Sequence, residues 1–77
     1  SVNGISLYPN PTTSKLNFSL NGIEGTPVRV IDFNGRIVLN TNISTNNSIN
    51  VETLTTGIYF IQLQVENKDV SYKFIKK

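Results

Sequence analysis

The longest strand-like pattern in the chain lies in residues 54–65, LTTGIYFIQLQV. From position 59 onward the odd-numbered residues are apolar or aromatic and glutamines stand at even positions, as in a strand with one buried face and one face in water. Ile58 and Phe60 are also apolar, so we expect both faces to be covered where the strand starts. Gly57 opens the strand, and we expect it to end the preceding turn with a positive φ. The stretch therefore predicts a central strand.

Shorter segments in which apolar and polar residues alternate flank this strand along the chain. They cover residues 15–20, 28–32, 36–43, 49–51 and 70–75. Asn, Gly and Pro turns separate them at intervals of about ten residues, a spacing typical of sandwiches. We therefore predict an all-β, immunoglobulin-like β-sandwich of about seven antiparallel strands, with a closed barrel as the less favoured alternative.

The first tight hairpin has two possible registers. A three-residue loop with Gly35 in the left-handed conformation pairs Asp32 with Arg36 and Val30 with Val38. A two-residue Asn-Gly turn shifts the valine pairing by one residue. We favour the three-residue loop because it places opposite charges across from each other.

The last hairpin is predicted from the faces of its two strands. An even number of loop residues keeps the apolar side chains of both strands on one face. We expect a loop over residues 66–69, which places Val65 opposite Val70 and Ile61 opposite Phe74.

Composition limits the function. The chain has 77 residues, a size for one domain, and residues 1–6 are expected to be the end of a linker. It contains no cysteine and no histidine, which argues against an enzyme, a cofactor or a metal site. The net charge is +2, and the basic residues are scattered until the last five positions, so nucleic acid is not a predicted partner. No apolar run spans a bilayer, and without methionine or a signal peptide the chain is expected to be part of a longer protein.

Four motifs, in a fixed order, carry a resemblance to a known family. They are Leu7-Tyr8-Pro9-Asn10-Pro11, Val28-x-Val30-x-Asp32-x-x-Gly35-Arg36-x-Val38, Leu54-x-x-Gly57-x-Tyr59, and Tyr72-Lys73-Phe74-Ile75-Lys76-Lys77. With them the chain resembles the C-terminal sorting domain (type A) of the type IX secretion system of Bacteroidetes.

The resemblance implies an export address for a cargo domain upstream in the same chain. The cargo would cross the inner membrane by an amino-terminal signal, and the sorting domain would then be recognised in the periplasm by the outer-membrane type IX translocon and its shuttle proteins. A cysteine-protease sortase would remove the domain at the cell surface and often attach the cargo to an anionic lipopolysaccharide.

The resemblance also assigns roles to residues. Machinery recognition falls to Gly57, Tyr59, Lys73, Phe74, Ile75, Lys76 and Lys77. The turn chemistry of the sequence itself indicates an architectural role for Pro9, Asn10, Pro11, Asp32, Gly35 and Arg36. No catalytic or metal-binding residue is implied. We expect the last strand and its end to be accessible, so that the strand pairs with a receptor strand and its lysines meet acidic groups.

Plainer interpretations stand beside these roles. Gly57 and Tyr59 also suit a turn glycine and a core tyrosine, and the final lysines suit charges that keep an edge strand soluble. The pair Asp32–Arg36 suits a turn far better than catalysis, because a neighbouring arginine lowers the pKa of a carboxyl group.

Two other functions compete with export. One is an immunoglobulin-like accessory module that binds carbohydrate or acts as a spacer. Sugar binding needs exposed aromatic side chains, for which Tyr8, Phe33 and Phe60 are the candidates. The other is a structural or adhesive repeat, which predicts neighbouring copies in the parent protein.

Overall fold

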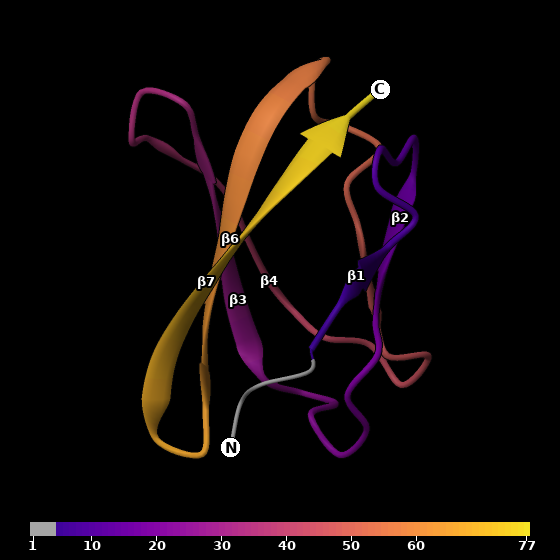
Figure 1. Cartoon of the computed structure of the whole chain (residues 1–77), viewed down its shortest axis with the longest axis vertical. Coiled ribbons are helices and arrows are strands. Elements are labelled where there is room, and N and C mark those ends of the chain that lie inside the picture. The colour runs from indigo at the N-terminus through magenta and orange to yellow at the C-terminus, as the bar shows by residue number, and fades with distance from the viewer. Residues whose placement is uncertain (1–4) are drawn as a thin grey trace.

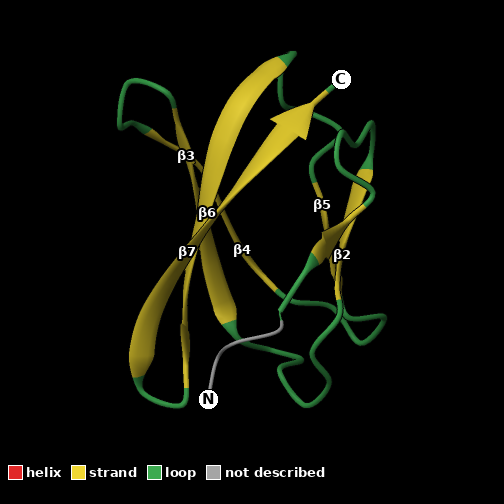
Figure 2. Cartoon of the chain, in the orientation of Figure 1, coloured by secondary structure: helices red, strands yellow, loops and turns green. Residues whose placement is uncertain are grey.

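A computed structural model describes residues 5–77, which fold into two packed antiparallel sheets (Figure 1). The strands are β1 (Leu7–Tyr8), β2 (Lys15–Phe18), β3 (Pro27–Asp32), β4 (Ile37–Asn42), β5 (Ser48–Asn50), β6 (Gly57–Val65) and β7 (Lys68–Lys76). One sheet has the order β1-β2-β5 and the other β4-β3-β6-β7. The described residues contain no helix (Figure 2), and the predicted all-β sandwich is confirmed.

Strand β6 lies inside the four-stranded sheet, between β3 and β7. Its alternation is confirmed, because every odd-numbered residue from Tyr59 to Val65 is buried against the other sheet. Two expectations at its start are wrong. Ile58 is 40% exposed and Phe60 is half-buried, so the second face is not covered there. Gly57 begins the strand as expected, but its φ is not among the positive ones.

The β3–β4 hairpin combines the two registers considered for it. The N–H group of Asp32 donates to the carbonyl of Arg36 at 2.9 Å, and Gly35 has a φ of 86°, as the three-residue loop requires. Further along, the pairing shifts between Val30 and Ile31, so that Val30 faces Leu39. The expected pairing of Val30 with Val38 is wrong, because a β-bulge leaves Val38 as an extra residue on the surface.

The β6–β7 hairpin has a shorter turn than expected. Glu66 and Asn67 both have positive φ, 54° and 63°, which gives a two-residue turn of the kind that favours tight hairpins. The apolar side chains share one face as predicted, but the register is displaced by two residues. Tyr59 lies opposite Phe74, and β7 begins at Lys68.

The core lies between the two sheets. Leu16 and Phe18 of β2 and Ile49 of β5 are buried and face the four-stranded sheet. Of the residues assigned to a linker end, 1–4 lie outside the described part. Ile5 is only 8% exposed and joins the core, while the N–H group of Ser6 donates to Ser19 Oγ at 2.7 Å.

Asn47 fastens the 44–48 turn to the end of β2. Its φ is 63°, and its amide Nδ2 donates to the carbonyls of Phe18 and Leu20, each at 2.7 Å. Carbonyl groups that are buried without a hydrogen-bond donor destabilise a fold. Where β2 ends, the Asn47 amide supplies the donor that a neighbouring strand would otherwise provide.

Replacing Asn47 should destabilise the domain more than replacing its neighbour. In Asn47→Gly the left-handed backbone remains favourable, but two carbonyls lose their donor, so the free energy of unfolding should fall by about 1–3 kcal/mol. Asn46→Gly is the control, because the Asn46 side chain is exposed. Urea unfolding of both variants measures the difference, and equal losses would contradict the role given to the Asn47 amide.

The two motif glycines should differ in their tolerance of a methyl group. Gly35→Ala forces alanine into a left-handed conformation and should cost about 1–2 kcal/mol. In Gly57→Ala the added Cβ would meet Tyr59 Cε2 at 3.9 Å, an ordinary contact, so stability should change little. Thermal or urea unfolding of both proteins tests this contrast, and a Gly57→Ala variant as unstable as Gly35→Ala would refute it.

Candidate functional site

The four sequence motifs meet at one end of the sandwich. Within the sheet, the start of β6 lies between the end of β3 and the end of β7, so that Tyr59 has Asp32 on one side and Phe74 on the other. In Figure 1 this is the upper end, where the β3–β4 loop, the start of β6 and the chain's C-terminus lie. We call it the motif end.

The first motif pairs with the last. Asn10 Oδ1 accepts a hydrogen bond from the N–H group of Ile75 at 2.9 Å, and the N–H group of Thr12 donates to the Ile75 carbonyl at 2.9 Å. The N–H group of Lys77 in turn donates to the carbonyl of Thr12 at 2.8 Å, which makes a short parallel bridge. The expectation that the end of the last strand is open is therefore wrong for its final residues.

Lys76 joins the third motif to the last. It is only 6% exposed, and its Nζ donates to the carbonyl of Leu54 at 2.9 Å. Its side chain lies on the same face of β7 as buried Phe74, at the mouth of the core. Lys76 therefore satisfies a backbone carbonyl and is not a solvent-exposed charge of the kind that protects a sheet edge.

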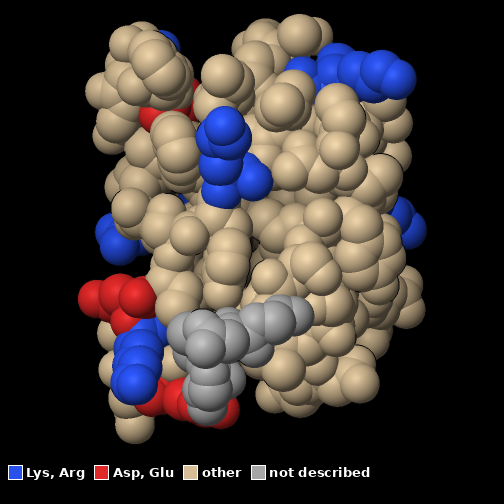
Figure 3. Space-filling view, in the orientation of Figure 1, with Lys and Arg blue, Asp and Glu red and all other residues tan. Residues whose placement is uncertain are grey.

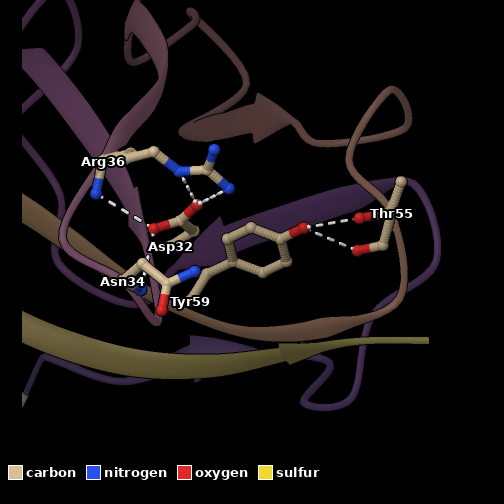
Figure 4. Close-up of polar contacts among 5 residues, drawn as sticks. All are labelled: Asp32, Asn34, Arg36, Thr55 and Tyr59. Atoms are coloured by element: carbon tan, nitrogen blue, oxygen red, sulfur yellow. Dashed lines mark hydrogen bonds and ion pairs between the residues drawn. The ribbon is translucent and has the colours of Figure 1, made fainter.

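Tyr59 is a core tyrosine with a bound hydroxyl. Its ring stacks on Phe74 with centroids 5.6 Å apart, and its hydroxyl donates to the carbonyl of Thr55 at 2.7 Å (Figure 4). The hydroxyl ties the loop before β6 to the strand itself. A buried tyrosine needs such a partner, because its hydroxyl would otherwise lose its hydrogen bond with water.

Asp32 organises the neighbouring turn. Its Oδ1 accepts from the N–H groups of Asn34 and Arg36 at 2.9 and 3.0 Å, and its Oδ2 accepts from Arg36 Nε at 2.9 Å (Figure 4). These donors, with the Arg36 backbone N–H first among them, lower the pKa of Asp32 below its usual value of 3.8. The pair acts as a turn support.

Three of the residues assigned to recognition present side chains to solvent. Lys73, Ile75 and Lys77 are exposed, with Ile75 at 39%. Gly57 is half-buried, and the side chains of Tyr59, Phe74 and Lys76 are buried. The lysines and arginines on the face seen in Figure 3 lie at several separate places and form no continuous band.

Among residues 5–77, the backbone edge of β7 is unpaired before it reaches Ile75. Antiparallel pairing turns the N–H and C=O groups of alternate residues away from the partner strand, and those of Ile75 point away from β6. By the same alternation the backbone groups of Asp69, Ser71 and Lys73 also point away from β6. In the described part of the chain no strand pairs with this stretch of the edge.

Thr12 is a functional candidate that sequence reasoning did not find. It is 1% exposed, and its hydroxyl donates to the carbonyl of Lys15 while its backbone bridges to β7. Its place directly after the Pro-Asn-Pro motif is the only signal in the sequence, and threonine is too common in this chain for that signal to stand out.

The surface offers little for a small ligand. A hollow of about 200 Å³ lies beside Arg29 and Asp69 and another of about 270 Å³ beside Lys15, and neither is lined by an aromatic residue. Of the aromatic candidates for sugar stacking, Tyr8 belongs to the three-stranded sheet and Phe60 to the other, and Phe33 lies in the β3–β4 loop. Tyr8 and Phe33 are exposed and Phe60 is half-buried. Among residues 5–77 no cluster of metal-ligating side chains occurs, and no helix is long and apolar enough to cross a membrane.

The Asp32 turn should make stability depend on pH in acid. Because its pKa is lowered in the folded state, the carboxylate stabilises the fold above the unfolded value near 3.8, and this contribution disappears as the pH falls through the folded pKa. Asp32→Asn should therefore be less stable than the parent at about pH 6, and the gap should close below about pH 3. Urea unfolding across this range measures the gap, with Glu52→Gln as the control. A gap that stays constant down to the lowest pH would count against the charged interaction.

Comparison with known proteins agrees with the convergence of the motifs. The family model described as "Secretion system C-terminal sorting domain" matches residues 6–77, nearly the whole chain and all four motifs. No curated protein matches the chain. The matched family is one of sorting signals and not of enzymes, and its members carry a signal for export toward the cell surface or the outside. The chain belongs to the family of C-terminal sorting domains of the type IX secretion system.

Proposed function

We propose that this domain directs an attached cargo across the outer membrane by presenting the motif end and the adjoining edge of β7 to the type IX machinery. The cargo precedes the domain in the same chain, and both pass through the periplasm before the translocon and its shuttle proteins bind the domain. A sortase then removes it at the surface. The single observation that supports this proposal most is the meeting of all four family motifs at one end of the sandwich.

The proposed recognition divides the motif residues into two groups. Tyr59, Phe74 and Lys76 are buried and shape the motif end from within. The exposed side chains of Lys73, Ile75 and Lys77 make the contact, in which two positive charges flank an apolar group. The division explains how one set of residues serves both packing and recognition, since neighbouring residues of β7 point to opposite faces of the sheet.

The backbone gives the second part of the contact. A receptor strand can pair with β7 along Asp69, Ser71 and Lys73 but not beyond, because the backbone of Ile75 is already bonded to Asn10 and Thr12. Pairing of a receptor strand would therefore end before Ile75. The receptor would then contact a fixed length of the β7 edge together with the exposed side chains of Lys73, Ile75 and Lys77.

Charge reversal tests the contact. We expect a periplasmic reporter fused ahead of residues 1–77 to appear in the medium or on the surface of a type IX-competent host. The double change Lys73→Glu and Lys77→Glu should lower export roughly tenfold, because like charges then face the receptor. Quantitative immunoblots of the medium, the surface fraction and the periplasm measure the change.

The control has the same change in net charge. Asn21→Asp, Asn40→Asp, Thr45→Asp and Asn46→Asp together add four negative charges at exposed positions outside β7 and outside the four motifs, and export should stay near that of the parent. These point changes test the contact more directly than deletion of residues 74–77 would, because Phe74 is fully buried and its loss would unfold the domain. A parent fusion retained in the periplasm would refute the export function, whereas full export of a folded Lys73/Lys77 variant would refute only the proposed contact.

A further inference from the structure

On the open edge of β7, two opposite charges stand at equal distances on either side of Ser71. Asp69 stands two residues before Ser71 and Lys73 two residues after it, and all three side chains are exposed. The three residues share the outer face of the sheet, because each differs by two positions from the next. Their backbone N–H and C=O groups point away from β6, as described above.

The open stretch is also centred on Ser71. On one side it ends at the turn of Glu66 and Asn67, directly before Lys68, where β7 begins. On the other side it ends where Ile75 is bonded to Asn10 and Thr12. The available edge therefore covers residues 68–74, and its midpoint is the midpoint of the charge pattern.

We propose that the occupant of this edge, in the free domain, is a second copy of the chain. Two β7 strands pair antiparallel with Ser71 opposite Ser71, so that Asp69 of each copy faces Lys73 of the other. Each of the three facing pairs exchanges two backbone hydrogen bonds, and the two four-stranded sheets become one continuous sheet across a twofold axis.

Charge complementarity favours a second copy over an unpaired, protected edge. Charged side chains, lysine above all, protect many edge strands from pairing, and charges of one sign would repel an identical strand. Here antiparallel self-pairing brings together Asp69 and Lys73 twice, since the twofold axis repeats each contact. Gln64 Nε2 already donates to Asp69 Oδ1 at 3.1 Å, which leaves Oδ2 for the lysine.

The inner face of the same pairing is also favourable. In this register Val70 of one copy stands opposite Tyr72 of the other, and both are half-buried at the rim of the core. Aromatic and β-branched side chains make good cross-strand partners. A register shifted by two residues would place Ser71 opposite Lys73 and drive one strand end against the bonded Ile75, so a single register is preferred.

This inference does not rest on the export function, since it concerns the purified chain alone. It bears on export because a receptor strand and a second copy would occupy the same edge, so the two complexes exclude each other.

Sedimentation velocity of the 77-residue chain over a wide concentration series tests the dimer. The parent should shift from monomer to dimer as concentration rises. Asp69→Lys and Lys73→Asp should each weaken dimerisation on the order of tenfold, because each places like charges in both facing pairs. An equimolar mixture of the two variants should recover the parent's behaviour, since every facing pair then joins opposite charges.

A backbone change gives an independent test. Ser71→Pro removes the N–H group at the twofold axis, which makes no bond to β6, and proline is tolerated on an edge strand. We expect a folded monomer by circular dichroism and sedimentation, whereas Ser71→Ala, which retains the N–H group, should dimerise as the parent does. A parent that stays monomeric throughout, a mixture no more associated than either variant alone, or a dimeric, folded Ser71→Pro protein would overturn the proposal.

Discussion

The pairing of β6 on both of its edges is the constraint on which the structure depends. Because β6 is bonded to β3 and to β7, its odd-numbered side chains meet those of both neighbours and form the floor of the core. The same ladder brings the Asp32 turn, the Tyr59 ring and the end of β7 to one place. An inner strand has no freedom to slip, since a displacement by one residue would turn its whole apolar face to solvent.

The features predicted well from the sequence are those that follow from the alternation of buried and exposed side chains along a strand. Residues Tyr59 to Val65 of β6, and Leu16 with Phe18 of β2, fall on the faces that alternation assigns to them. The failures come from local geometry that the pattern does not contain. The bulge at Val38 is invisible because valine suits either face, and the turn at Glu66 and Asn67 contains no glycine to mark its two left-handed residues.

The sequence motifs name the residues of the motif end but do not predict how these residues are arranged. The motifs named Asn10 and Ile75, but nothing in their spacing indicates that an asparagine oxygen meets an amide 65 residues away. The contact of Lys76 could not be predicted from the sequence either. A lysine beside the end of a strand suggests a surface charge, and only the fold reveals that its stem crosses the rim of the core to reach Leu54. Such contacts depend on which elements become neighbours, so they are properties of the tertiary structure.

The junction between Asn10, Thr12 and Ile75 has a consequence for the order of folding. It closes a loop that spans almost the entire polypeptide, and the entropy lost in closing such a loop is recovered only after shorter-range contacts have brought its ends together. The junction is therefore among the last contacts to form and among the first to be lost on partial unfolding. The closed junction therefore distinguishes a fully folded domain from a partly folded one. A receptor that binds the motif end would by the same contact select domains that have completed folding.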